Sequence, residues 1–254
     1  MELYFRDFGG EDRLIVILHG LFGSSKNWVG VGRFLTAFGR CYALDLRNHG
    51  DSPHARSHSL QDLIGDLGEW LDVHGEGPPI LIGHSMGGLA AMGYALKMPE
   101  RVRAIVVVDI APRVYPYGHR REFEALKIDI SACATRPQID EQMRAIIPAP
   151  EVRRFLQMNI ARTGDGFRWK LNVQALERST VNADVAGLKG EYTGRALFIA
   201  GERSGYVRAQ DHRRIMACFP NASIDTLPDA DHWLHYSAAD AFKQRLGEFV
   251  AESV

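Results

Sequence analysis

Six segments of the chain are almost continuously apolar and rich in β-branched residues, and each is bounded by glycine, proline or polar residues. They are residues 14–18, 41–46, 79–82, 102–110, 196–200 and 222–227. Strands that are buried on both faces lose the alternation of apolar and polar side chains, which is typical of parallel sheets. The pattern therefore predicts a mostly parallel central sheet. Residues 2–8 are a candidate for an antiparallel hairpin at its edge.

Between these segments, apolar positions recur with the spacing of an α-helix. Residues 24–38 begin with two serines that can cap a helix, and residues 89–98 stop before Pro99. Residues 60–74 gather large apolar side chains on one face, namely Leu63, Leu67, Trp70 and Leu71. Strands that alternate with helices through right-handed crossovers predict the α/β class, with a doubly wound sheet flanked by helices.

One long segment, residues 111–194, interrupts this alternation. It shows no convincing strand pattern, and a connection of this length is too long for an ordinary loop. Its helical patterns cover residues 121–130, 139–147 and 151–161. We predict that the segment is a helical cap, or lid, inserted over the carboxyl edge of the sheet. Residues 1–110 and 195–254 would then form the core.

The composition fits one globular domain and gives no reason to expect a nucleic-acid partner. The chain has 254 residues, of which 46% are hydrophobic and 24% charged, and its formal net charge is -1.

No apolar run approaches the roughly 20 residues that span a bilayer, and the amino terminus has no signal-peptide pattern. Cys41, Cys133 and Cys218 have no zinc or disulfide spacing, which indicates a reducing compartment. We expect a soluble, cytoplasmic protein without a cofactor or metal. The sequence indicates no oligomeric state.

The pentapeptide Gly83-His84-Ser85-Met86-Gly87 has the pattern G-x-S-x-G between a predicted strand and a predicted helix. A serine on such a sharp turn has a strained backbone, so its neighbours must be small. The turn holds the hydroxyl clear of the sheet at the positive end of a helix, where developing negative charge is stabilised. This context predicts that Ser85 is a nucleophile, rather than an incidental serine in a glycine-rich turn.

An activated serine needs a base, and the base needs an orienting acid. Among the ten histidines, His232 is the best candidate for the base, because it follows the last predicted strand and precedes the final helix. This place lies at the carboxyl edge of the sheet, beside the predicted serine turn, and it completes the chain order Ser, Asp, His. His235 is the alternative.

The acid departs from the usual pattern. In most α/β-hydrolases it follows the strand after the cap, but here Ser204 occupies that place, and the nearby Glu202 is very close to the strand end. Asp109 ends a run of three valines, where a buried charge needs a partner such as a histidine N–H. We therefore predict Asp109 as the acid. The alternatives are Glu202, and a structural role in which Asp109 caps a turn near Pro112.

The loop His19-Gly20-Leu21-Phe22-Gly23 directly follows the first strong strand and is the candidate oxyanion hole. Two backbone N–H groups must point at the oxyanion, and we expect them from Leu21 and from Met86 in the serine turn. The glycines allow the backbone to approach closely. The spacing of residues 20–26 matches neither of the glycine patterns that bind phosphate.

Five blocks of sequence together resemble the α/β-hydrolase superfamily and, within it, the small esterases of the bacterial cytoplasm. The blocks are HGLFGSSKNW, DLRNHGDSPH, GHSMGG with PERV following, VVDIAP and DHW. A related mitochondrial α/β-hydrolase-domain protein of eukaryotes carries the same blocks. The resemblance covers the core in order and the cap only loosely. The family usually has glycine where this chain has Asp231.

This resemblance implies the α/β-hydrolase fold and supports Asp109, the aspartate of VVDIAP, as the acid. It also implies hydrolysis of short-chain acyl esters, and some members accept acyl thioesters of coenzyme A. We therefore expect a serine hydrolase that cleaves small carboxylic esters through an acyl-enzyme. An acyl-CoA thioesterase or a lactonase would share the same catalytic residues. A hypothesis of a different class is a ligand-sensing receptor with this fold and little turnover.

Several aromatic and polar side chains are candidates for substrate contacts. We expect Phe22, His84, Tyr115 and Trp233 to bind the substrate. Other side chains of the predicted cap either line a pocket or pack internally, and these are Tyr117, His119, Arg120, Arg121, Phe123 and Trp169.

Overall fold

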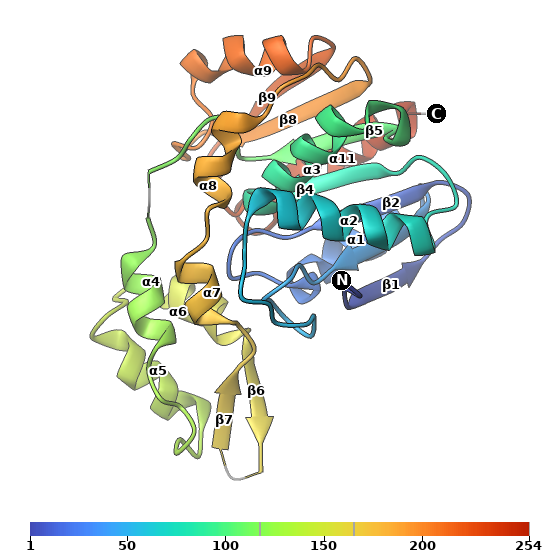
Figure 1. Cartoon of the computed structure of the whole chain (residues 1–254). Coiled ribbons are helices and arrows are strands. Elements are labelled where there is room, and N and C mark those ends of the chain that lie inside the picture. The colour runs from blue at the N-terminus through green and yellow to red at the C-terminus, as the bar shows by residue number, and fades with distance from the viewer. Residues whose placement is uncertain (117, 165, 254) are drawn as a thin grey trace.

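A seven-stranded sheet forms the centre of the molecule in the computed structural model, which describes residues 1–116, 118–164 and 166–253 (Figure 1). All neighbouring strands are parallel except for the first pair. The strand order is β1 (Phe5–Gly9), β3 (Arg40–Leu44), β2 (Leu14–Leu18), β4 (Ile80–His84), β5 (Ala104–Val108), β8 (Arg195–Gly201) and β9 (Ala222–Leu227). All six strands predicted from apolar runs are present.

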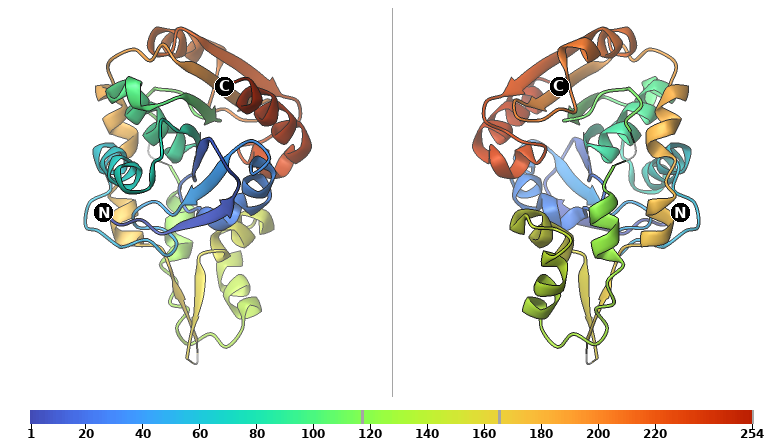
Figure 2. Two further views of the ribbon diagram at one scale, coloured as in Figure 1. Left: turned by 90° about the vertical axis from the view of Figure 1, so that its right-hand side faces the viewer. Right: turned by 90° about the vertical axis from the view of Figure 1, so that its left-hand side faces the viewer.

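Helices cover both faces of the sheet (Figure 2). One face packs against α2 (Leu60–His74), α3 (Met86–Lys97) and α9 (His212–Cys218). The other face packs against α1 (Val29–Leu35) and α11 (Ala239–Glu252). Successive strand residues therefore enter two different apolar cores, which explains the continuous apolar runs. Among the described helices, none is both long enough and apolar enough to cross a membrane.

Two helix boundaries and the edge of the sheet differ from the sequence prediction. Residues 24–38 form a 3-10 turn, η1 (Ser25–Trp28), followed by α1, rather than one helix. Helix α3 begins at Met86 instead of residue 89, because the chain passes directly from the serine turn into the helix. Strand β1 is the expected antiparallel edge strand, but it pairs with β3 and does not form a hairpin with the next strand in sequence.

Most of the segment between β5 and β8, which we call the insertion, lies to one side of the layered core (Figure 1), and its last helix packs against α2. Its helices are α4 (Arg120–Leu126), α5 (Arg136–Arg144), α6 (Pro150–Gln157), α7 (Val173–Glu177) and α8 (Val181–Asp184), the last continued by η3 (Val185–Gly187). The prediction that this segment lacks strands is wrong, because β6 (Ile160–Thr163) and β7 (Gly166–Trp169) form an antiparallel hairpin. Each strand has only four residues, which is too short to show an alternating pattern.

The insertion has an apolar cluster of its own, and one residue of the core completes it. Phe22, from the loop after β2, is buried in this cluster and packs edge-to-face against Phe123 of α4, with ring centroids 5.0 Å apart. The candidate oxyanion loop is therefore physically part of the packing of the insertion.

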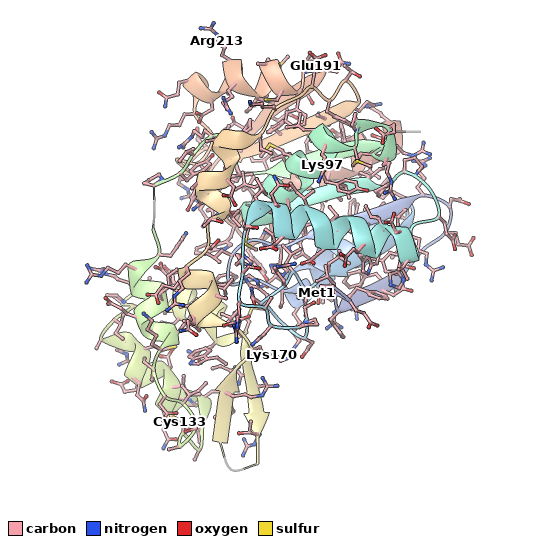
Figure 3. The ribbon with its side chains drawn as sticks, viewed as in Figure 1. Met1, Lys97, Cys133, Lys170, Glu191 and Arg213 are labelled. Carbon is pink, nitrogen blue, oxygen red and sulfur yellow. The ribbon has the colours of Figure 1, made fainter. Side chains whose placement is uncertain are left out.

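Polar contacts also attach the insertion to the loop that follows β3. Lys170 (Figure 3) forms an ion pair with Asp51, and its carbonyl oxygen lies 2.8 Å from Nε2 of His54. The N–H of Asn172 donates to the carbonyl oxygen of Asn48 at 3.0 Å, and its side-chain amide donates to the Asn48 side chain at 3.0 Å. These bonds fix one side of the insertion against the core.

Candidate active site

Ser85 lies in the turn between β4 and α3. Its backbone has φ +51° and ψ −118°, a conformation that residues with a side chain rarely adopt. The turn is possible because Gly83 and Gly87, two residues to either side of Ser85, have no side chains. A Cβ on Gly87 would lie 2.3 Å from the carbonyl oxygen of Leu18, and one on Gly83 would lie 2.3 Å from that of Gly87. The G-x-S-x-G segment therefore has the strand–turn–helix geometry that its sequence predicts.

Asp109 follows β5 directly, is fully buried and also has a positive φ of 52°. Its Oδ2 accepts a hydrogen bond from Nδ1 of His232 at 2.7 Å, and its Oδ1 accepts the N–H of Gly201 at 3.0 Å. The hydroxyl of Ser204 also donates to Oδ2. Because a carboxylate only accepts hydrogen bonds, Nδ1 of His232 carries a proton, and Nε2 is the ring nitrogen that can take the proton of a nucleophile.

Glu202, the alternative acid, has a different partner. Its side chain is exposed, and its Oε2 accepts the N–H of Asp229 at 2.9 Å. The structure thus joins His232 to Asp109 and not to Glu202. The structural role weighed for Asp109, capping a turn near Pro112, does not account for its bond to the histidine.

The ring and the backbone of His232 have separate contacts. The Tyr206 ring stacks on it with centroids 4.0 Å apart and an interplanar angle of 19°. The carbonyl oxygen of His232 lies 2.8 Å from Nε2 of His84, which donates to it. Asp231, which replaces the usual glycine, accepts the N–H of Trp233 at 2.7 Å through its own carboxylate. The carboxylate of Asp231 therefore bonds within its own turn, to a residue two positions later in the chain.

His235, the alternative base, lies in the short helix α10 (Leu234–Ser237) and is buried. It stacks on Trp28 with centroids 4.5 Å apart and an interplanar angle of 12°. Burial lowers the pKa of His235 to about 3, so the ring is neutral at ordinary pH. This environment fits a packed core histidine and not a group that exchanges protons with a substrate.

Both residues that are expected to supply the oxyanion donors, Leu21 and Met86, line the larger cavity together with Ser85. Met86 is the first residue of α3, so its N–H belongs to the amino-terminal groups that a helix leaves unpaired. Within the described part of the chain, the N–H of Leu21 makes no hydrogen bond. Leu21 and Ser85 line the same two cavities, so both N–H groups belong to the surroundings of the serine.

Phe22, the residue after Leu21, makes hydrogen bonds through both its backbone N–H and its backbone carbonyl group. Phe22 has a positive φ of 61°, and its N–H donates to Nε2 of His49 at 3.2 Å. Its carbonyl oxygen accepts the side-chain amide of Asn159, from the insertion, at 2.7 Å. Burial holds the pKa of His49 well below its usual range, which keeps Nε2 unprotonated and able to accept. These two bonds hold the peptide groups on both sides of Phe22, next to the peptide group that carries the Leu21 N–H.

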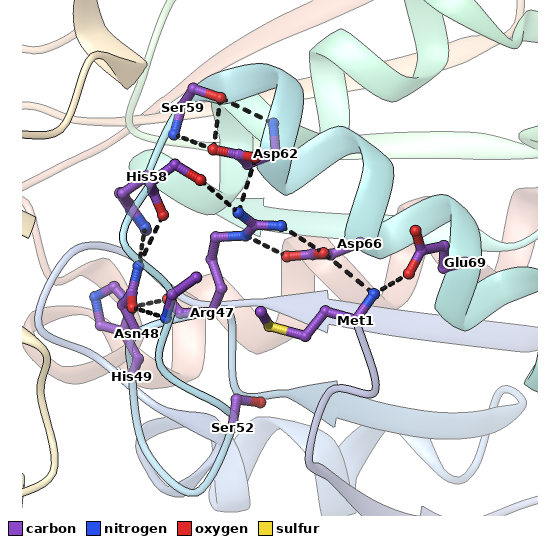
Figure 4. Close-up of polar contacts among 12 residues, drawn as sticks. Met1, Arg47, Asn48, His49, Ser52, His58, Ser59, Asp62, Asp66 and Glu69 are labelled. Carbon is purple, nitrogen blue, oxygen red and sulfur yellow. Dashed lines mark hydrogen bonds and ion pairs between the residues drawn. The ribbon is translucent and has the colours of Figure 1, made fainter. Parts of the chain in front are cut away.

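His49 belongs to a polar loop that is anchored on α2 (Figure 4). Arg47 donates to Asp66 at 2.7 Å and pairs with Asp62 at 2.8 Å. The side-chain amide of Asn48 donates to the carbonyl oxygen of Ser57 at 3.1 Å. Sequence reasoning identified this loop as the block DLRNHGDSPH but assigned no role to His49 or to Asn159, because their common partner, Phe22, is distant in the sequence.

Two cavities meet at Ser85. The larger has a volume of about 440 Å³ and the smaller about 210 Å³. Four residues line both cavities, and these are Leu21, Ser85, His119 and Tyr206. The serine therefore lies at the junction of two separate spaces, each of which can receive one part of a substrate.

All four residues expected to contact the substrate lie at these cavities. Phe22, His84 and Trp233 line the smaller one, and Tyr115 lines the larger. Tyr115 is also structural, since its hydroxyl accepts the N–H of Ala111 at 2.8 Å and donates to the carbonyl oxygen of Tyr206 at 2.7 Å.

The other cap candidates divide into two groups. His119 lines both cavities and Phe123 lines the larger. Arg120 and Arg121 are exposed, and Trp169 packs within the insertion, with its Nε1–H donating to the carbonyl oxygen of Ile128 at 3.1 Å. Tyr117 lies outside the described residues. In those residues, no group of three or more His, Cys, Asp or Glu side chains could hold a metal ion.

The sheet order, the strained serine turn and the hydrogen bond from His232 to the buried carboxylate of Asp109 together define a hydrolase-type α/β protein. The family model described as "Alpha/beta hydrolase family" matches residues 15–245, and the chain belongs to this family. The predicted fold is thereby confirmed.

Named relatives are similar over most of their length. The chain is 35% identical over 247 residues to the mouse (Mus musculus) sn-1-specific diacylglycerol lipase ABHD11, covering 93% of this chain and 80% of that protein. It is 32% identical over 238 residues to Escherichia coli (strain K12) esterase YbfF, covering 93% and 92%. A solved structure, "Marine microorganism esterase", is 36% identical with a TM-score of 0.93, covering 98% of this chain and 99% of that one.

Proposed function

We propose that this protein is a serine hydrolase that cleaves carboxylic esters of small molecules through an acyl-enzyme. The observation that carries the proposal is the hydrogen bond between His232 Nδ1 and the buried carboxylate of Asp109, beside the strained turn of Ser85. The names of its relatives, an esterase and a diacylglycerol lipase, point to the same reaction class.

The proposed mechanism moves one proton back and forth. As Ser85 Oγ attacks the acyl carbon, its proton passes to Nε2 of His232, and the carbonyl oxygen becomes an oxyanion bound by the N–H groups of Leu21 and Met86. The intermediate then expels the alkoxide, which takes the proton from Nε2. Water repeats the sequence on the acyl-enzyme and releases the carboxylic acid. Asp109 holds the Nδ1–H tautomer throughout.

We also propose that residues 111–194 act as a cap over the core formed by residues 1–110 and 195–254. The insertion contributes residues to both cavities, including Leu176 and Val181 in the larger and Phe155 and Leu156 in the smaller. A substrate bound at Ser85 would therefore be enclosed partly by insertion side chains. The short acyl chains implied by the resemblance remain a prediction.

The proposal is tested with p-nitrophenyl butyrate and a fluorophosphonate probe. A hydrolase gives steady release of nitrophenol over many turnovers, and the probe labels Ser85. A ligand-sensing receptor with this fold would instead give a single burst. Acetyl-CoA and palmitoyl-CoA, assayed in parallel, separate ester from thioester hydrolysis. Absence of steady turnover on all of these substrates would refute the proposal.

A further inference from the structure

The two cavities at Ser85 differ in their contact with the base. His232 lines the smaller cavity, together with His84 and Trp233. The larger cavity instead continues along Met86 and Leu89 of α3. The two sides of the serine are therefore chemically distinct.

The proton transfer decides which part of an ester enters which side, if the proposed function holds. In the tetrahedral intermediate, the leaving oxygen must receive its proton from Nε2 of His232, so the alcohol portion lies on the side of that ring. The acyl chain must then point away from the ring. We infer that the smaller cavity binds the alcohol portion and that the larger cavity binds the acyl chain.

The walls of the larger cavity fit an alkyl chain. Its lining includes buried apolar side chains from the core, from the insertion and from helix α3, and these are Leu89, Ile110, Phe123, Leu176 and Val181. Asn182 and Arg208 are exposed, so they lie where the cavity meets solvent. Two half-buried polar residues of the lining have partners elsewhere: Arg113 pairs with Asp211, and the hydroxyl of Ser179 donates to the carbonyl oxygen of His58. Apolar walls of this kind bind acyl chains by removing their surface from water.

The smaller cavity fits a compact, uncharged alcohol. Val152, Phe155 and Leu156 of α6 contribute apolar walls, and Glu122 contributes a carboxylate. Burial lowers the pKa of the neighbouring His119 below its ordinary value, which favours an uncharged ring beside Glu122. A leaving group with negative charge is therefore disfavoured. The substrate class is an ester whose alcohol is small and neutral and whose acyl group is the larger of its two parts.

An isomeric pair of substrates tests this assignment. Ethyl octanoate and octyl acetate have the same atoms and similar hydrophobicity, but the long chain is on the acyl side in one and on the alcohol side in the other. We expect kcat/KM for ethyl octanoate to exceed that for octyl acetate by at least about tenfold, as pocket fit commonly provides. Equal rates, or a preference for octyl acetate, would overturn the assignment.

Two matched variants locate the effect. Asn182→Trp narrows the larger cavity and should lower the ratio of kcat/KM for ethyl octanoate to that for octyl acetate. Val152→Trp narrows the smaller cavity and should raise the same ratio. Neither side chain is fully buried, so both variants should fold, and circular dichroism checks this.

Different results would refute the assignment of the cavities and the proposed ester hydrolysis. If the variants shift the ratio in the same direction, or leave it unchanged, the assignment of the cavities is wrong while ester hydrolysis stands. If wild-type protein fails to turn over even p-nitrophenyl butyrate, the proposed function fails and the cavity assignment fails with it.

Discussion

Three donors converge on the carboxylate of Asp109, namely Nδ1 of His232, the N–H of Gly201 and the hydroxyl of Ser204. A fully buried carboxylate requires such partners, because burial without them is costly. Ser204 stands in the part of the sequence where most hydrolases of this fold carry the acid. In this protein the hydroxyl of Ser204 donates a hydrogen bond to Asp109, and Asp109 follows a different strand, β5.

Replacing Asp109 by Asn should keep the fold and lower kcat by roughly 10⁴, because an amide favours the wrong histidine tautomer. The matched control is Glu202→Gln, which should cost less than about tenfold, since the Glu202 side chain bonds only its neighbouring loop in the described structure. Both are measured as turnover of p-nitrophenyl butyrate, with circular dichroism to check folding. A folded, active Asp109→Asn beside an inactive Glu202→Gln would move the acid to Glu202.

The sequence predicted those residues of the candidate site whose local pattern is specific. Ser85 has its glycines beside it, and Asp109 and His232 each follow a strand, so parallel-sheet topology brings them to one edge. His49 and Asn159 could not be found in this way. Their role depends on one shared partner, Phe22, which is 27 and 137 residues away from them along the chain.

At the scale of elements, the oxyanion loop is coupled to the insertion. The Phe22 side chain packs in the apolar cluster of the insertion, and Asn159, just after α6, binds its carbonyl oxygen. The orientation of the N–H group of Leu21, the residue before Phe22, therefore depends on the position of the insertion relative to the core. A cap that only covered the site would not have this connection.

Asn159→Ala should lower kcat about tenfold with little change in KM, because the loop loses a buried hydrogen bond and Leu21 N–H becomes less well oriented. Gln157→Ala is the matched control. It removes a buried amide two residues earlier that bonds Asp140 within the insertion, at 2.8 Å. Steady-state kinetics on p-nitrophenyl butyrate compare the two. An equal loss in both variants, or no loss in Asn159→Ala, would contradict the coupling.

The elements themselves were predictable to different degrees. The central strand β2 is buried along its whole length and has the predicted bounds, because each of its residues faces one of two cores. Strand β9 also has the predicted bounds, although it is an edge strand and only Leu227 in it is buried. The β6–β7 hairpin was missed. Its strands are short, and a Cβ on Gly166 would lie 1.8 Å from the carbonyl oxygen of Ser131, so glycine is required there by a contact that the local sequence does not reveal.

At the scale of the whole molecule, five buried histidines link stability to pH. Burial lowers the pKa of His19 to about 4 and those of His58 and His235 to about 3, and it holds those of His49 and His84 well below their usual range. In the unfolded chain each takes up a proton near pH 6.5. Their stabilisation is therefore complete above that pH and is lost progressively as the pH falls toward 4 and 3.

We expect the free energy of unfolding to drop between pH 7 and pH 5, by about 2 kcal/mol for each of His19, His58 and His235. His235→Phe keeps the stacking on Trp28 and removes one titrating group, so its stability should depend less on pH. Denaturant unfolding at pH 7, 6 and 5 measures this. An unchanged pH dependence in the variant would show that His235 does not contribute.

The central claim is that Ser85 is the nucleophile of an ester hydrolase, and the steady-state turnover of p-nitrophenyl butyrate by Ser85→Ala tests it most directly. The substitution removes one hydroxyl and should leave the fold intact by circular dichroism. Removal of such a nucleophile typically costs on the order of 10⁶ in kcat. We therefore expect turnover to fall to background. A folded Ser85→Ala protein that retains a tenth of the wild-type rate would contradict the account.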